Sequence, residues 1–177
     1  LYNNLFPGGY MRASTIKGLL IHTADDIGSV GPDYSYGWGM VNTEAAANHI
    51  RGQALNPSSY RIVESLLDST TPSESYAFTW DGSSPIRATL CWTDPAGPIQ
   101  SGLDVATPVL TNDLDLRILG PGGSPSYQPF VLNGASPASL ATTGDNTVDN
   151  IEQVLISSPS TAGTYTVQVT HKGTLTN

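Results

Sequence analysis

The sequence predicts a mainly β protein, an antiparallel jelly-roll β-sandwich of about seven or eight strands preceded by a short helical segment. Two observations carry this prediction. From Tyr60 onward, apolar and polar residues alternate with a period of two, which is typical of half-buried strands. Turn-forming pairs such as Asp81-Gly82 separate the alternating stretches, whereas helical periodicity is confined to residues 1–52.

Two helices are expected in this N-terminal segment, after an irregular entry over residues 1–12. The first begins with Ser14 as its N-cap and ends near Gly28. The second runs from residue 43 to residue 50, with Asn42 as its N-cap. Each helix has an apolar face but no sheet of its own to cover it, so we expect both to dock on the sandwich or on a partner outside this chain.

The rest of the chain is expected to form the sandwich domain, residues 60–177, after a linker over residues 53–59 that contains Asn56-Pro57. Its size, about 115 residues, is normal for a β-sandwich. Strands are predicted over residues 60–67, 75–80, 85–93, 113–119, 127–132, 151–157 and 163–171.

Composition limits the classes of partner. The net charge is −8, with only 7 Lys and Arg residues, which argues against nucleic acid and against anionic membrane surfaces. No apolar run is long enough to span a bilayer, and the first residues lack the pattern of a signal peptide. Since the chain does not start with Met, we expect it to be a cut-out or processed piece. Cys91 is the only cysteine and is expected to be a buried, inert thiol.

One acidic stretch stands out, the run Asn112-Asp113-Leu114-Asp115-Leu116. Alternation places Asp113 and Asp115 on one face of the predicted strand, where two like charges repel unless a cation lies beside them. Two interpretations are open. The face is simply solvated, or the carboxylates bind a hard cation such as Ca²⁺, which prefers oxygen ligands.

Further acidic residues could join such a site. Asp145, Asp149 and Glu152 belong to an Asp/Asn-rich turn that leads into the strand over residues 151–157, and the spacing is not that of an EF-hand loop. Asp94 ends the strand over residues 85–93. If these strands are neighbours of the strand over residues 113–119, their acidic ends could meet.

Nucleophilic catalysis has little support in this sequence. Neither Gly-x-Ser-x-Gly nor Gly-Thr-Ser-Met-Ala occurs. His22 and Asp25 lie three residues apart in the first predicted helix, a spacing that a helix-surface pair explains. Asp113 and Asp115, about 7 Å apart along a strand, could act as a glycosidase pair in principle, but nothing else indicates a sugar cleft.

A family resemblance becomes specific at longer motifs. The run Leu20-Ile21-His22-Thr23-Ala24, the turn Tyr36-Gly37-Trp38-Gly39-Met40-Val41-Asn42 and an Ala-rich helix resemble the end of a subtilisin-like serine peptidase domain. The second half resembles the C-terminal jelly-roll β-barrel of the alkaline, oxidatively stable subtilases, which is similar to the P-domain of kexin-like proteases. The matching segments are residues 90–96, 112–116, 120–123, 145–154 and 162–167.

The resemblance implies a secreted serine endopeptidase as the parent protein, with an upstream peptidase domain in the same polypeptide and a protein or peptide substrate. It implies that the catalytic Asp, His and Ser lie upstream of Leu1, so no catalytic residue is assigned to this chain. It also implies structural calcium sites in the barrel. The ligands carried over are Asp94, Asp113, Asp115, Asp145, Asp149 and Glu152.

An alternative function is a free-standing jelly-roll module that binds carbohydrate or protein. Compared with the subtilase pattern, the chain has two insertions, residues 97–111 and 133–143, which could serve as binding loops. Jelly rolls host many functions, so the fold does not decide between the two readings. Exposed aromatic residues on one sheet face would favour binding, and Trp80 and Tyr127 are the candidates, although both suit a core position better.

Overall fold

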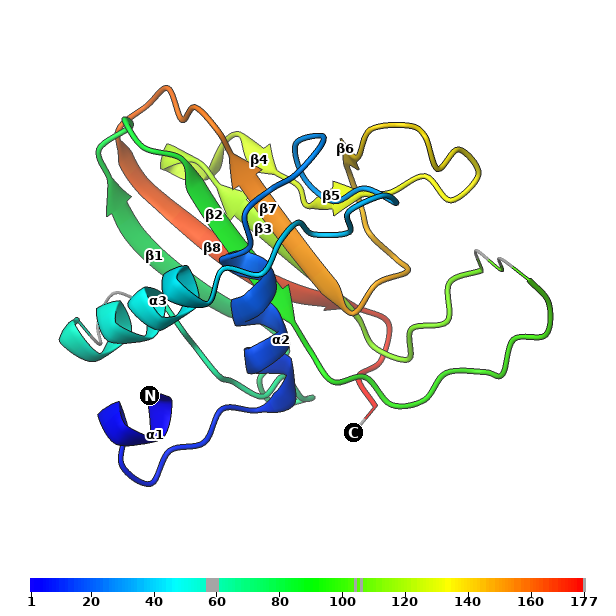
Figure 1. Ribbon diagram of the computed structural model, residues 1–177, viewed down its shortest axis with the longest axis horizontal. Helices are drawn as coiled ribbons and strands as arrows, with labels where there is room; N and C mark the ends of the chain where they lie inside the picture. The colour runs from blue at the N-terminus through cyan, green and yellow to red at the C-terminus, as the bar shows by residue number, and fades with distance from the viewer. Residues whose placement is uncertain (57–60, 104, 106, 177) are drawn as a thin grey trace.

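The structure, a computed structural model, describes residues 1–56, 61–103, 105 and 107–176. It is mainly β, with antiparallel sheets and a short helical part on one side (Figure 1). The helical elements are α1 (Tyr2–Leu5), α2 (Ala13–His22), α3 (Thr43–Leu55) and the 3₁₀ turn η2 (Pro121–Gly123). None of the described helices has the length and hydropathy that crossing a lipid bilayer would need.

In the part of the chain that the structure describes, the strands form three antiparallel sheets. A four-stranded sheet has the order β1-β8-β3-β4, a two-stranded sheet pairs β2 with β7, and a small one pairs β5 with β6. The bounds are β1 (Glu74–Trp80), β2 (Ile86–Cys91), β3 (Asp113–Leu119), β4 (Ser126–Tyr127), β5 (Phe130–Val131), β6 (Thr142–Thr143), β7 (Ile151–Ile156) and β8 (Gly163–Lys172). This arrangement is consistent with a β-sandwich, and its jelly-roll connectivity stays a prediction.

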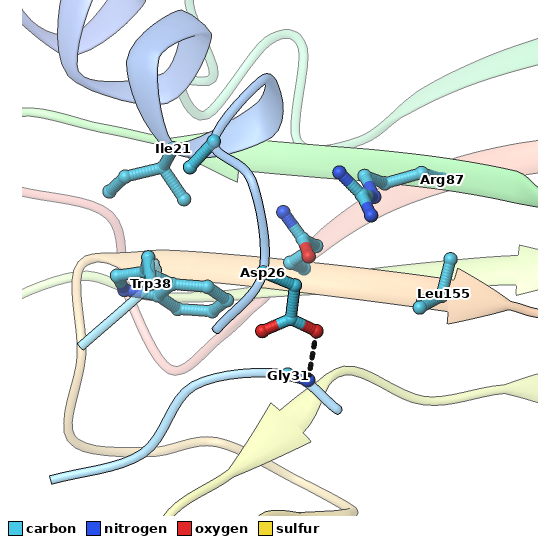
Figure 2. Close-up of a pocket in the computed structure, with 8 residues that line it drawn as sticks. Ile21, Asp26, Gly31, Trp38, Arg87 and Leu155 are labelled. Atoms are coloured by element: carbon cyan, nitrogen blue, oxygen red, sulfur yellow. Dashed lines mark hydrogen bonds between the residues drawn. The ribbon is translucent and has the colours of Figure 1, made fainter. Parts of the chain in front are cut away.

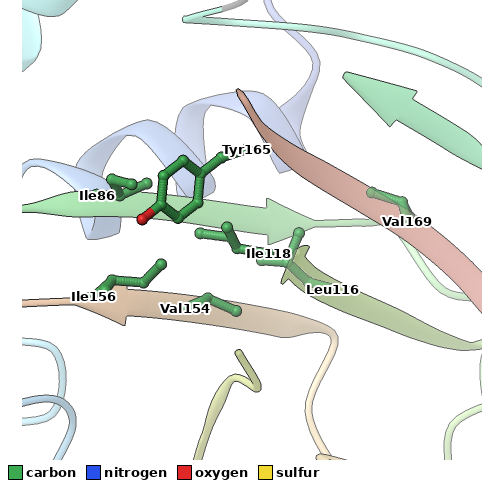
Figure 3. Packing of buried hydrophobic residues seen from close by; sticks show 7 residues of the cluster. All are labelled: Ile86, Leu116, Ile118, Val154, Ile156, Tyr165 and Val169. Atoms are coloured by element: carbon green, nitrogen blue, oxygen red, sulfur yellow. The ribbon is translucent and has the colours of Figure 1, made fainter. Parts of the chain in front are cut away.

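The main core lies between the four-stranded sheet and the β2–β7 pair. Leu116 and Ile118 on β3 pack with Val154 on β7, and each is at most 2% exposed. Figure 3 shows these side chains pointing toward one another from facing strands. The cluster is completed by Ile86, Ile156, Tyr165 and Val169. Because the inward residues come from alternate positions, the period of two in the sequence predicted this core correctly.

The helical part covers the outer face of the β2–β7 pair. Helix α2 packs against β2, and Ile21 lies near Leu155 of β7 around a small cavity. Helix α2 therefore docks on the sandwich, which was one of the two expectations for this segment, and α3 packs against α1 and α2. Strand β7 is consequently covered on both faces, and five of its six residues are buried.

Helix α2 ends at His22, six residues before the predicted stop at Gly28. The backbone of Asp25 leaves the helix to pair with Met40, with both N–H···O distances at 2.9 Å. A side chain at Gly39 would lie 2.2 Å from the Asp25 carbonyl oxygen, so this close approach needs glycine there. The predicted end was wrong because a long-range bridge competes with local helix continuation.

Helix α3 starts as predicted and ends later. The Asn42 side chain accepts a hydrogen bond from Ala45 N–H at 2.8 Å, which confirms the N-cap. The helix continues to Leu55 instead of stopping at Ile50, so it enters the predicted linker, whose last three residues lie outside the described part of the chain. The Arg61 side chain packs over Gly52. Because glycine has no side chain, the guanidinium fits there while the helix continues unbroken.

No strand forms over residues 61–67, so that prediction was wrong for the residues of it that the structure describes. The segment follows the helices instead. The Glu64 carboxylate accepts hydrogen bonds from Arg12 N–H and the Thr15 hydroxyl at the start of α2, where the helix dipole favours an anion. The other departures are small. Neither α1 nor β6 was predicted, and the predicted strand over residues 127–132 is split into β4 and β5. Ser14 was wrong as the N-cap of α2, because Arg12 occupies that position.

Candidate functional site

Three carboxylates converge on one ammonium group at the outer face of β3 and β8. The Lys172 Nζ atom lies 3.2 Å from Asp113, 3.1 Å from Asp115 and 2.8 Å from Asp145. Strand pairing places Lys172 directly opposite Asp113, and the turn before β7 brings Asp145 over them. The cation that the acidic strand needs is therefore supplied by the protein itself.

A second cation, Arg117, binds two of the same carboxylates. Its Nη2 atom lies 3.0 Å from Asp115 and 2.9 Å from Asp145. The hydrogen bond from Lys172 lowers the pKa of Asp145 to about 2, since it stabilises the ionised carboxylate. We call Asp113, Asp115, Arg117, Asp145 and Lys172 the ion-pair cluster.

Glu152 lies beneath the ion-pair cluster and is fully buried, with 0% exposure. One carboxyl oxygen accepts a hydrogen bond from Leu116 N–H at 2.5 Å, at a part of β3 that β4 does not reach, because β4 pairs only with Ile118 and Leu119. Arg117 is 4.0 Å away. Burial raises the pKa of Glu152 to about 8, so the carboxyl is largely neutral at neutral pH. A neutral Glu152 limits the charge repulsion with Asp115.

Asp94 serves a different purpose, at the base of the insertion over residues 97–111. Its two carboxylate oxygens accept hydrogen bonds from Thr111 N–H at 2.7 Å and Asn112 N–H at 2.8 Å. Asn112 in turn holds the C-terminal segment through two hydrogen bonds with the backbone of Thr176. Asp94 therefore closes the loop that leads into β3, and its described contacts do not include the ion-pair cluster.

Asp149 also lies apart from the ion-pair cluster. It accepts a hydrogen bond from the Asn146 side-chain amide at 3.1 Å, and Asn146 accepts one from Val148 N–H. These bonds shape the turn before β7. Of the six residues predicted as ligands, the structure thus brings Asp113, Asp115 and Asp145 together, places Glu152 beneath them, and leaves Asp94 and Asp149 in local hydrogen bonds.

The fit of a calcium ion can be judged from these contacts. Among the residues that the structure describes, no three His, Cys, Asp or Glu side chains are grouped so that they could hold a metal. The space between Asp113, Asp115 and Asp145 holds the Lys172 ammonium. A calcium ion could use these oxygens only if Lys172 moved out, because two cations cannot share the position.

A small polar cavity lies where the turn after α2 meets the β2–β7 pair. Figure 2 shows Trp38 and Ile21 on one side and Arg87 on the other, with Asp26 between them. Asp26 accepts a hydrogen bond from Gly31 N–H at 2.9 Å, which holds the turn in place. The free space has room for about one water molecule, so this cavity suits packing and not the binding of a substrate.

Sequence reasoning missed the two cations of the ion-pair cluster as site residues. Arg117 was visible, since it follows Asp115 by two positions and so shares its face. Lys172 lies one residue beyond the predicted end of the last strand, and its role depends on the pairing of β3 with β8. The alternation from Thr170 to Lys172 could have placed it on the polar face, but not beside Asp113.

Comparison with known proteins finds a similarity over part of the chain. Over 119 residues the chain is 32% identical to the serine protease/ABC transporter B family protein tagA of Dictyostelium discoideum. The alignment covers 66% of this chain and 6% of that protein, so the chain spans a small part of its relative's length. No family model matches the chain. The similarity supports a protease-related region.

Proposed function

We propose that the chain is the C-terminal part of a secreted subtilisin-like serine endopeptidase, in which the β-sandwich supports an upstream peptidase domain. The chain itself supplies no catalytic triad. Its role is structural: the sandwich provides a folded base, and residues 1–55 complete the edge of the peptidase domain. The similarity to a protein named as a serine protease supports the protease part of this proposal.

The observation that carries the proposal is the uncovered apolar surface of the helical part. Helix α2 has no fully buried residue although it contains Ile16, Leu19, Leu20 and Ile21. Ile16 is 47% exposed, and the turn after α2 exposes more apolar side chains, namely Val30, Tyr34, Tyr36, Met40 and Val41. An apolar helix covered on one side only, beside a patch of this kind, is typical of a surface that another domain covers.

Calcium stabilisation of the sandwich is the second part of the proposal, and it is restricted to Asp113, Asp115 and Asp145. The approach of all three carboxylates to one ammonium group, within 3.2 Å, supports it, because carboxylate oxygens are the ligands that Ca²⁺ prefers. The ammonium of Lys172 offers a competing account of the same carboxylates. A calcium ion bound only to the folded chain would add stability by mass action, and chelation separates the two accounts.

The peptidase proposal is tested by comparing this chain with a longer polypeptide from the same gene. The purified 177-residue chain is expected to leave casein intact. The sequence before Leu1 is expected to contain a Gly-Thr-Ser-Met-Ala-type motif, and a polypeptide that includes it should cleave casein. Substituting Ala for the Ser of that motif is the matched control and should remove the activity.

Two results would contradict the peptidase proposal. One is casein hydrolysis by the 177-residue chain that is lost when one of its own serines is substituted. The other is a start codon close to Leu1 in the gene.

The alternative function, a free-standing binding module, rests on the insertion over residues 97–111. Ile99 is 99% exposed and Leu103 is 94% exposed, and the described parts of the insertion project away from the sheets (Figure 1). The aromatic candidates do not add support, because Trp80 and Tyr127 pack against the core. Binding on a glycan array by the chain, removed by Ile99→Ser together with Leu103→Ser, would favour this alternative.

A further inference from the structure

Two histidine rings meet where α2, α3 and β2 join. His22 is the last residue of α2 and His49 belongs to α3. Their ring centroids are 4.9 Å apart and the rings are inclined at 63°. This contact lies outside the ion-pair cluster, and neither the proposed structural role nor calcium makes use of it.

His22 is tied to the sheet through both its side chain and its backbone. Its Nδ1 atom lies 3.0 Å from the Thr89 hydroxyl oxygen, and the Gln153 amide donates a hydrogen bond to the same oxygen at 3.0 Å. Its carbonyl oxygen accepts a hydrogen bond from the Arg87 guanidinium at 2.8 Å. His22 therefore links α2 to β2 directly and to β7 through Thr89.

The charged groups around His22 repel a proton. Arg87 on β2 and His49 on α3 are the charges that act on it, while β7 contributes the neutral Gln153. His49 itself donates from Nε2 to the Arg61 carbonyl oxygen at 3.0 Å. Among the described contacts, neither ring has a carboxylate partner. The nearest acids along the chain are engaged elsewhere, Asp25 with Asn42 and Asp26 with Gly31.

Protonation of His22 is therefore costly while the helices are docked. Burial, followed by the charges of His49 and Arg87, lowers the pKa of His22 from 6.5 to about 4. In a detached helix the ring regains its ordinary pKa. Between these two values the detached form binds a proton that the docked form does not, so docking weakens as the pH falls and is unaffected above the ordinary pKa.

We propose that the His22–His49 contact is a proton-operated latch, which holds α2 on the β2–β7 pair and α3 against α2 at neutral pH and releases both helices on acidification. The device acts on the helical part alone, because the main core between the two sheets includes no histidine among the residues that the structure describes. Release would uncover the outer face of β2 and β7, which the helices cover at neutral pH.

Hydrogen exchange of the 177-residue chain tests the latch. Protection of α2 and α3 is compared with that of β3 and β8, after correction for the intrinsic pH dependence of exchange. From about pH 7.5 to about pH 4.5, proton linkage predicts that the helices lose protection roughly 70-fold relative to the strands. His22→Asn keeps a polar atom toward Thr89 and should abolish most of this relative loss.

Two further variants keep the test decisive. His49→Gln keeps a donor toward the Arg61 carbonyl without the ring charge, so it should reduce the loss even if His22→Asn fails to fold. His171→Asn, in β8, removes the third histidine of the chain and should leave the loss unchanged. The proposal is overturned if helices and strands lose protection in parallel, or if the loss persists in both His22→Asn and His49→Gln.

Discussion

The sandwich and the helical part bury their apolar residues to very different degrees. Leu116, Ile118, Val154 and Tyr165 are each at most 2% exposed, in a core made by two sheets that face each other. In residues 1–55, by contrast, Ala46 and Ile50 are the buried residues of α3, and α2 has none. The sandwich thus makes its own core, whereas the helical part relies on the surfaces that it touches.

The largest effect is expected in the core. Ile118→Ala leaves a cavity between the two sheets, because Ile118 has 0% exposure and packs against both. Large-to-small substitutions at such sites lower the free energy of unfolding by about 2–5 kcal/mol. Chemical denaturation of the variant measures the loss. A loss below that of a surface substitution would show that the sandwich is not the stable part of the chain.

An intermediate effect is expected from calcium at the edge of this core. If calcium binds the folded sandwich, excess chelator lowers the melting temperature, and a hundredfold excess of calcium over its dissociation constant adds about 2.7 kcal/mol. Asp113→Asn and Asp115→Asn should reduce this response. Asp149→Asn is the matched control and should preserve it, since Asp149 lies apart from the ion-pair cluster.

A chelator that leaves the melting curve unchanged would contradict calcium stabilisation. It would indicate that Lys172 and Arg117 alone neutralise the carboxylates of the ion-pair cluster. In that case the protein's own cations alone stabilise the acidic outer face of β3.

The smallest effect is expected on the open side of α2. Ile16→Ser removes an apolar side chain that is already 47% exposed, so the free energy of unfolding should change by no more than about 0.5 kcal/mol. In the longer polypeptide the same substitution should lower the melting temperature clearly, because the peptidase domain would then cover Ile16. Equal effects in both forms would mean that this face of α2 stays open to solvent.

Local patterns account for much of the fold. Alternation of apolar and polar residues predicted β1, β2, β3, β7 and β8, because each strand needs one face for the core. The N-cap at Asn42 was also predictable from local sequence, because its side chain accepts a hydrogen bond from Ala45 N–H, only three residues along the chain. The spacing of Asp113 and Asp115 also placed both carboxylates on one face, where they repel each other unless a cation lies beside them, but it left a solvated face equally open.

Only the tertiary structure shows which contacts form between segments that are far apart in the sequence. Asp25 ends α2 because Met40 pairs with it, and Glu64 leaves the predicted strand because the start of α2 attracts its carboxylate. The identity of the nearest cation was also decided there. Lys172 is 59 residues from Asp113 along the chain, and only the register of β3 with β8 places its ammonium among the carboxylates. Alternation and capping act over a few residues, whereas a charge finds its partner only when the sheets assemble.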